Sequence, residues 1–297
     1  MKIEDILAND PLVLDQGQRE FYFEHGYLLL ERFVSIDWLK RLRAVTDEFV
    51  EASRALAKSN NTLDIEADHT AASPRLRRLC DPVEHHPVFW EFTSRGPIVD
   101  LAADLVGPDV KYHHSKLNFK WRGGGEEVKW HQDAQFWPHS DYSPLTIGVY
   151  LDDVADDMAP MGVIPKSHEG ELFDLYDKDE VWTGAIREAD LGRVALDEAV
   201  FLAGPAGSVT VHNCRMVHGS LPNTSARSRP LLLQTYTSAD ALKLTGLTDG
   251  LVHSNQIVRG KPAKWINFDP RPCLIPPDWS KGYTSIFAAQ QEEEART

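Results

Sequence analysis

The segment His131-Gln132-Asp133 has the residue types and the spacing of a metal site. On a strand, side chains two residues apart point to the same face, so this imidazole and this carboxylate would converge on one point. We expect His218, at the end of a strand-like run farther along the chain, to supply a third ligand. Two histidines and one carboxylate form a facial triad with open coordination positions, which suits a non-haem Fe(II) oxygenase.

A second copy of the pattern, His139-Ser140-Asp141, competes for the same role. Prolines and serines surround this copy, and such residues are typical of a turn. We therefore predict that the metal binds at His131 and Asp133. The alternative for that pair is an ordinary hydrogen-bonded contact at the surface.

Two arginines, Arg227 and Arg229, stand just before the strand-like segment 231–237. A buried guanidinium needs an anionic partner, and a dicarboxylate co-substrate would supply one. Because the two arginines are two residues apart, they would share a face on a regular strand. Either could therefore bind a co-substrate, and the alternative is a pair of surface arginines.

The overall composition restricts the possible partners. The chain has 297 residues, and its 45 acidic residues outnumber its 31 Lys and Arg residues, for a net charge of −14. This balance argues against nucleic acid and anionic membranes as partners. Three cysteines without CxxC spacing, and no signal-peptide pattern, favour a reducing compartment. We therefore expect a cytoplasmic protein that acts on a small molecule, and the oligomeric state stays open.

The elements that position these residues can also be predicted. Helical periodicity and end signals indicate helices over 16–25, from Ser35 to about 49, and over 97–107. Short apolar segments bounded by turn residues predict the strands 27–30, 110–120, 145–151, 162–164, 199–202, 208–211, 216–218 and 231–237. We expect one α+β domain over 1–297, in which a largely helical part (1–107) packs on one face of a β-rich barrel or jelly roll (108–240). An extension (241–297) follows and ends in a frayed acidic tail.

Taken together, these motifs resemble the phytanoyl-CoA dioxygenase family, a branch of the Fe(II)- and 2-oxoglutarate-dependent oxygenases that includes ectoine hydroxylase. The resemblance runs from about Phe21 to Tyr236 and rests on Lys120, His131-Gln132-Asp133, Ile164-Pro165-Lys166-Ser167-His168, His218-Gly219-Ser220, Asn223, Ser225 and Arg229. It implies a double-stranded β-helix of the cupin-like type. It also implies Fe(II) held by His131, Asp133 and His218, with 2-oxoglutarate and O2 as co-substrates.

The resemblance further implies roles for individual pocket residues. Arg229 would bind the far carboxylate of 2-oxoglutarate, with Ser220 and Lys120 as further contacts. His114 falls where ectoine hydroxylases carry a substrate-contacting side chain.

Three other residues are weaker candidates for the substrate pocket. Phe136 and Trp137 follow the metal motif and could line the pocket mouth, or they could simply pack in the core. Many family members carry a Trp at the position of Gly148, so the smaller glycine could enlarge the pocket.

The implied reaction is hydroxylation of an unactivated C–H bond with release of succinate and CO2, and desaturation or ring closure are alternatives. Related halogenases carry a small residue in place of the carboxylate, so Asp133 argues against halogenation. We expect a small neutral or zwitterionic substrate. The alternative from a different class is a non-catalytic or non-oxidative metal-binding protein on the same barrel.

Overall fold

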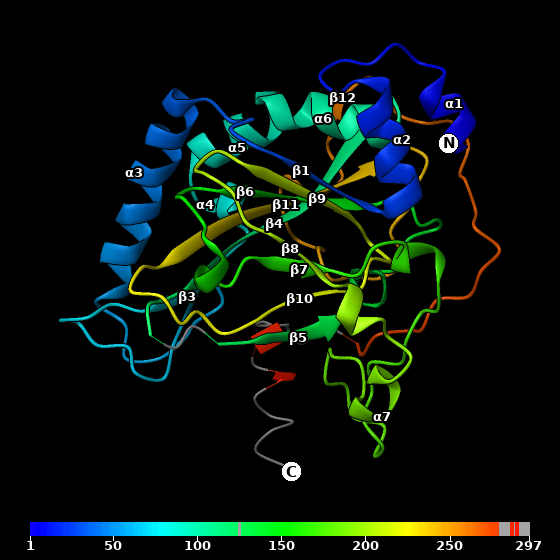
Figure 1. Ribbon diagram of the computed structural model, residues 1–297. Coiled ribbons are helices and arrows are strands. Elements are labelled where there is room, and N and C mark those ends of the chain that lie inside the picture. The colour runs from blue at the N-terminus through cyan, green and yellow to red at the C-terminus, as the bar shows by residue number, and fades with distance from the viewer. Residues whose placement is uncertain (124–125, 279–285, 288, 291–297) are drawn as a thin grey trace.

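Two antiparallel sheets face each other and enclose the centre of the molecule (Figure 1). The structure is a computed structural model that describes residues 1–123, 126–278, 286–287 and 289–290. Its strands are β1 (Tyr27–Leu30), β2 (Leu63–Ile65), β3 (Leu76–Cys80), β4 (Val110–Lys120), β5 (Val128–His131), β6 (Leu145–Tyr150), β7 (Met161–Val163), β8 (Val200–Leu202), β9 (Val209–Asn213), β10 (His218–Ser220), β11 (Arg229–Ser238) and β12 (Ile257–Arg259). Its α-helices are α1 (Ile3–Leu7), α2 (Gln16–His25), α3 (Ile36–Ser53), α4 (Pro82–His85), α5 (Pro87–Arg95), α6 (Pro97–Val106) and α7 (Glu188–Leu191).

The eight strands from β4 to β11 form a double-stranded β-helix. The larger sheet has the order β1-β9-β6-β11-β4-β3-β2, with β12 also paired to β4. The smaller sheet has the order β5-β10-β7-β8. Successive strands therefore cross repeatedly between the sheets, which confirms the predicted jelly-roll fold and its α+β class.

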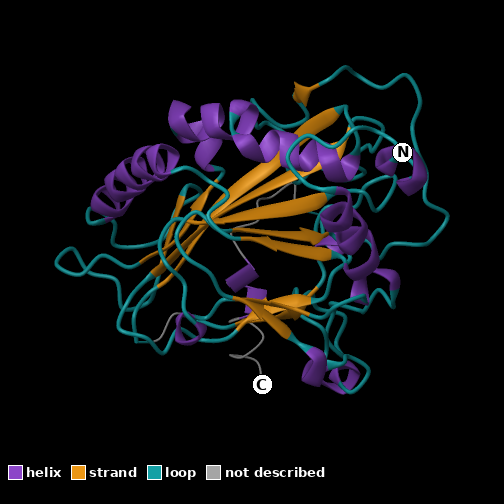
Figure 2. Cartoon of the chain, turned by 45° about the horizontal axis from the view of Figure 1, so that its top comes forward, coloured by secondary structure: helices purple, strands orange, loops and turns teal. Residues whose placement is uncertain are grey.

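Helices α3, α5 and α6 cover the outer face of the larger sheet (Figures 1 and 2). Their apolar side chains and those of the sheet form one core, in which Leu42 and Phe92 meet Ile147, Val211 and Leu232. Strand side chains alternate between the two faces of a sheet, so the strand residues that alternate with Ile147, Val211 and Leu232 point toward the smaller sheet. This alternation directs the polar side chains of β4 into the barrel.

The N-terminal part contains more strand than the sequence predicts. Strands β1, β2 and β3 all extend the larger sheet, whereas only β1 was expected. Strand β10 begins at His218 rather than ending there. The predicted frayed tail begins at Gln290, which is buried rather than frayed, and the rest of that tail, 291–294, lies outside the described residues. Within the part of the chain that the structure describes, no helix combines the length and the apolar character needed to cross a membrane.

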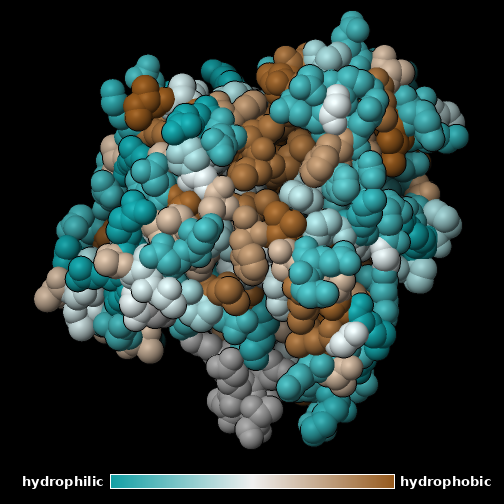
Figure 3. Space-filling model, viewed as in Figure 1, coloured by the Kyte–Doolittle hydropathy of each residue, from teal (hydrophilic) through white to brown (hydrophobic). Residues whose placement is uncertain are grey.

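One side of the barrel ends at strand β1 of the larger sheet and strand β8 of the smaller one. Phe21, Leu29 and Phe201 line a groove along these strands. Hydrophobic side chains gather in the middle of the face shown in Figure 3, with polar side chains around them. Apolar packing of Tyr27 and Leu29 with Val200, rather than pairing between β1 and β8, connects the two sheets on this side.

The start of α3 offers a test of the predicted cap. The Oγ of Ser35 accepts a hydrogen bond from the backbone N–H of Trp38 at 3.4 Å. Ser35→Ala should lower the free energy of unfolding by about 1 kcal/mol, because one N–H of the first turn loses its partner. Denaturant unfolding measures this change. The matched variant Lys40→Ala, which removes only an exposed ion pair with Asp37, should stay within about 0.5 kcal/mol of the parent; equal losses in both would contradict the cap.

Candidate metal and co-substrate site

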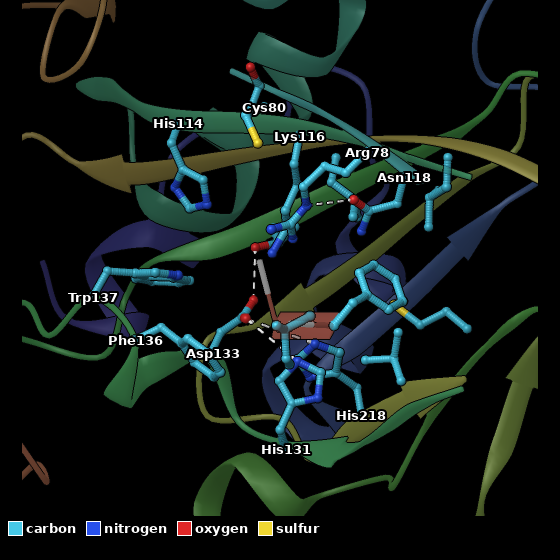
Figure 4. A pocket seen from close by; sticks show the side chains of 18 of the residues that line it. Arg78, Cys80, His114, Lys116, Asn118, His131, Asp133, Phe136, Trp137 and His218 are labelled. Atoms are coloured by element: carbon cyan, nitrogen blue, oxygen red, sulfur yellow. Dashed lines mark hydrogen bonds and ion pairs between the residues drawn. The ribbon is translucent and has the colours of Figure 1, made fainter. Parts of the chain in front are cut away.

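A cavity of about 180 Å³ lies between the two sheets and contains most of the residues singled out in the sequence. Strands β4, β6, β9 and β11 of the larger sheet and β5 and β10 of the smaller one contribute to its walls. Figure 4 shows this cavity from close by, with His131, Asp133 and His218 on one side.

These three residues bring one ligand atom each to a common point. His131 ends β5, His218 begins β10, and the two are directly paired in the antiparallel register. Asp133 lies in a 3-10 turn, Asp133–Gln135, rather than on the predicted strand, yet it turns to the same point. Its Oδ1 lies 3.9 Å from Nε2 of His131 and 4.0 Å from Nε2 of His218. All three side chains are buried, and their ligand atoms lie within 4.8 Å of one another.

Backbone carbonyl groups set the ring orientation of both histidines. The Nδ1 of His131 lies 2.9 Å from the carbonyl oxygen of Lys129, and the Nδ1 of His218 lies 2.9 Å from that of Met216. A proton on Nδ1 that is donated to a carbonyl leaves Nε2 with its lone pair toward the common point. Burial lowers the pKa of His131 to about 4 and that of His218 well below its usual value. Both imidazoles are therefore neutral, as metal ligands must be.

Asp133 is ionised despite its burial. Burial by itself raises the pKa of Asp133, but nearby Lys116 and a contact with His212 hold it well below its usual value. The Nε2 of His212 lies 3.4 Å from the second carboxylate oxygen, Oδ2, and Oγ1 of Thr146 lies 3.3 Å from the same oxygen. Because these groups contact Oδ2, Oδ1 remains available to a metal.

The second copy of the motif has a structural role. Asp141 accepts hydrogen bonds from the backbone N–H and the hydroxyl of Ser143 and from the amide of Asn267. The Nδ1 of His139 lies 2.7 Å from the carbonyl oxygen of Trp137. These contacts fix a turn, and neither residue belongs to the three-residue group at the common point.

Arg229 is a buried cation at the other end of the cavity. It begins β11, directly opposite Lys120 of β4 in the register, and is 3% exposed. Its Nε and Nη1 lack any hydrogen-bond acceptor among the described residues. Leaving such donors unpaired is costly, so this orphaned guanidinium fits a carboxylate ligand. Arg227, in contrast, is exposed and does not line the cavity.

Lys120 and Ser220 lie beside Arg229 in the cavity wall. The Nζ of Lys120 donates hydrogen bonds to the carbonyl oxygens of Ser220, at 2.9 Å, and Leu221. Burial and the neighbouring Arg229 lower the pKa of Lys120 to about 6. Lys120 therefore ties β4 to the end of β10, where the strand leaves the smaller sheet.

Three of the four predicted substrate residues lie in the cavity wall. His114, Phe136 and Trp137 line the cavity, and the rings of His114 and Trp137 meet edge to face at 5.7 Å. Burial lowers the pKa of His114 to about 3, so its ring is neutral.

Gly148 is not part of the cavity wall, and the expectation that it enlarges the pocket is wrong. A Cβ at this position would lie 2.6 Å from Oγ1 of Thr210 and 3.1 to 3.2 Å from side-chain carbons of Leu231 and Leu233. These neighbours fill the space over the glycine, and the two leucines themselves form the wall.

Several lining residues were missed in the sequence. Arg78 of β3 and Lys116 and Asn118 of β4 form a polar wall, and Leu247, Thr248, Leu251, Ile286 and Phe287 come from the C-terminal extension. The period-2 pattern of β4 could have found Lys116 and Asn118, since both lie between His114 and Lys120 on one face. Nothing in the sequence of the extension indicates a pocket wall.

The donors present fit Fe(II) and 2-oxoglutarate. Two neutral imidazoles and one carboxylate are the ligands of a non-haem Fe(II) site with open positions, and the orphaned Arg229 can pair with a carboxylate of the co-substrate. A closed structural zinc site would need a fourth ligand, and the described residues bring three together.

Comparisons with known proteins agree with this chemistry. The family model for phytanoyl-CoA dioxygenase matches residues 22–231. The chain is 31% identical to a probable alpha-ketoglutarate-dependent hypophosphite dioxygenase of Stutzerimonas stutzeri, over 93% of this chain and 96% of that protein. It is 26% identical to an ectoine dioxygenase of Stutzerimonas stutzeri strain A1501, over 79% of this chain and 80% of that one.

The fold is shared with solved oxygenase structures. EctD from S. alaskensis with bound Fe has a TM-score of 0.65 and 22% identity, over 89% of this chain and 90% of that one. The non-heme alpha ketoglutarate dependent carbocyclase SnoK has a TM-score of 0.63 and 22% identity, over 85% of this chain and 98% of that one. The alternative of a non-catalytic barrel finds no support among these relatives. The chain belongs to the phytanoyl-CoA dioxygenase family and is a 2-oxoglutarate-dependent non-haem iron dioxygenase.

Proposed function

We propose that this enzyme hydroxylates a small molecule and consumes 2-oxoglutarate and O2 as it does so. In the balanced reaction, R–H, O2 and 2-oxoglutarate yield R–OH, succinate and CO2. The observation that carries the proposal is that three buried metal-ligand atoms and an orphaned buried guanidinium share one cavity. A metal ion would bind the three ligand atoms, and a carboxylate of 2-oxoglutarate would pair with the guanidinium.

His131, Asp133 and His218 would hold the iron, which when bound with 2-oxoglutarate activates O2 for attack on a nearby C–H bond. The carbonyl groups of Lys129 and Met216 keep Nε2 of each histidine aimed at the metal. The contacts of Thr146 and His212 fix the carboxylate of Asp133. The chain thus supplies a preorganised ligand set before the metal binds.

Arg229 would pair with the far carboxylate of 2-oxoglutarate, with Ser220 and Lys120 as its neighbours. Because Lys120 lies opposite Arg229 in the register, a carboxylate at Arg229 would also favour the protonated form of Lys120. Both groups lie on paired strands of the barrel. This arrangement would fix the orientation of the co-substrate relative to the three ligands.

The cavity favours a small substrate. Its volume of about 180 Å³ is below the ~300–1,000 Å³ common for sites that take drug-sized ligands, and it must also hold the co-substrate. His114, Phe136 and Trp137 would surround the substrate beside the metal. The relatives named for hypophosphite and ectoine also act on small molecules.

Coupled turnover tests this function. Enzyme supplied with Fe(II), 2-oxoglutarate and O2 should release succinate faster when its substrate is added, in equal amount to the hydroxylated product. Hypophosphite, L-proline and ectoine are the first compounds to examine, because relatives carry their names. Failure of metal-loaded, oxygen-free enzyme to bind 2-oxoglutarate in calorimetry would contradict the proposal.

A further inference from the structure

The wall of the cavity opposite the metal ligands is cationic. In the pairing of β3 with β4, Arg78 is opposite Asn118 and Cys80 is opposite Lys116, so these side chains are neighbours on one face of the sheet. Figure 4 shows Arg78, Lys116 and Asn118 extending from that sheet into the space above Asp133. Positive charge is therefore concentrated inside a protein whose net charge is strongly negative.

Lys116 has few partners for its charge. In the described part of the chain, no group accepts a hydrogen bond from its Nζ, and no carboxylate lies within ion-pair distance of it. The carboxylates that act on Lys116 from farther away are Asp133 and Asp81. Arg78 donates a hydrogen bond through Nε to Oδ1 of Asn118 at 2.9 Å, which leaves the amide N–H groups of Asn118 able to donate to a ligand.

Occupation of the metal site would reduce the counter-charge further. A divalent cation held by Asp133 would neutralise that carboxylate, and of the two carboxylates that act on Lys116 only Asp81 would then remain. Buried cations without counter-charge are costly. The cavity in its loaded form therefore needs an additional negative group near Lys116.

The carboxylate of 2-oxoglutarate that would bind the metal offsets the second charge of the metal, and the distal carboxylate does not meet this need either. It is proposed to pair with Arg229, which lies opposite Lys120, whereas Lys116 lies opposite Leu233. Four residues along a strand correspond to about 13 Å. The two cationic positions on β4 are thus separate, and they can take different anions.

We infer that the substrate carries an oxyanionic group, a carboxylate or a phosphorus oxyanion, which Lys116 binds beside the metal. The inference rests on the proposed function and adds the chemical class of the substrate. It revises the expectation of a neutral compound, while a zwitterion still fits. The apolar side chains of Trp137 and Phe287 would meet the rest of a small substrate.

Calorimetry on oxygen-free enzyme loaded with Fe(II) and 2-oxoglutarate tests the inference. The probes are hypophosphite and acetate, with neutral dimethylphosphine oxide and acetamide as their matched analogues. The parent enzyme should bind one anion or both more tightly than the neutral analogues, and which anion binds identifies the oxyanion. Lys116→Met should weaken that binding about 10- to 100-fold, because a charged hydrogen-bond donor is lost. Lys116→Arg should recover most of the affinity.

The binding of 2-oxoglutarate, measured first in each protein, separates this inference from the proposed function. If the parent enzyme does not bind 2-oxoglutarate, both the proposed function and this inference are wrong. If only Lys116→Met fails to bind 2-oxoglutarate, Lys116 contacts the co-substrate rather than the substrate, and the inference is overturned. Equal affinity for anionic and neutral probes in the parent, or unchanged anion affinity in Lys116→Met, would also overturn it. Lys58→Met, which removes an exposed lysine outside the cavity, should bind every probe like the parent.

Discussion

Asp133→Ala should bind Fe(II) more weakly and lose substrate-dependent succinate formation. The substitution removes the anionic donor of the three-residue group and leaves two neutral imidazoles, so we expect at least a ~10-fold loss of metal affinity. The vacant position should not make the enzyme an efficient halogenase, since a misplacement of ~1 Å can cost about 100-fold in rate. Metal titration, and product analysis with and without chloride, measure both effects.

The second copy of the motif provides the matched control. Asp141→Asn changes the same residue type at the same place in the pattern, yet Asp141 only holds a turn through Ser143 and Asn267. This variant should keep its iron and its activity. Substrate oxidation at the parent rate by Asp133→Ala would show that Asp133 is not a metal ligand. Loss of iron in Asp141→Asn would show that the metal binds at the second motif, His139-Ser140-Asp141.

Arg229→Ala should weaken 2-oxoglutarate binding by about 2–5 kcal/mol, the usual cost of removing one partner of a buried charge pair. The guanidinium is buried, its Nε and Nη1 lack acceptors among the described residues, and the residues that follow it in β11, Pro230 to Leu233, carry no charge. Titration of Mn(II)-loaded, oxygen-free enzyme with 2-oxoglutarate measures the loss directly, without a need for the substrate.

Arg227→Ala is the corresponding control, because Arg227 lies two residues earlier and is exposed. Its 2-oxoglutarate affinity should match that of the parent. If Arg227→Ala lost its affinity for 2-oxoglutarate and Arg229→Ala kept it, Arg227 would be the residue that binds the co-substrate, while the assignment to the enzyme family would stand.

The barrel was predictable where local pattern and long-range packing agree. The bounds of β4 match the prediction, Val110–Lys120, because Gly and Pro precede an alternating segment. The cap of α3 at Ser35 and the α6 helix that begins at Pro97 were also predicted. Such elements carry their own start and stop signals, and the barrel strands and helices around them could therefore be recognised from the sequence.

Other features depend on contacts that no local pattern contains. Strand β3 is a short, arginine-bearing segment, and it becomes a strand because it pairs with the edge of β4. Arg78 enters the cavity through that pairing. Gly148 was misjudged for the same reason, because its space belongs to Leu231 and Leu233 of the neighbouring strand. Tertiary pairing and packing decide such positions.

The walls of the cavity come from two different sources. The proposed metal and co-substrate residues lie on or beside the central barrel strands, whereas Arg78 comes from the N-terminal part and Leu247 and Phe287 come from the C-terminal extension. Changes in these outer segments can therefore alter which molecule is accepted without disturbing the reactive centre. Such a division lets the outer segments vary the size and shape of the accepted molecule around the fixed Lys116 of β4, and it makes them a natural place to redesign the enzyme for another substrate of the same charge.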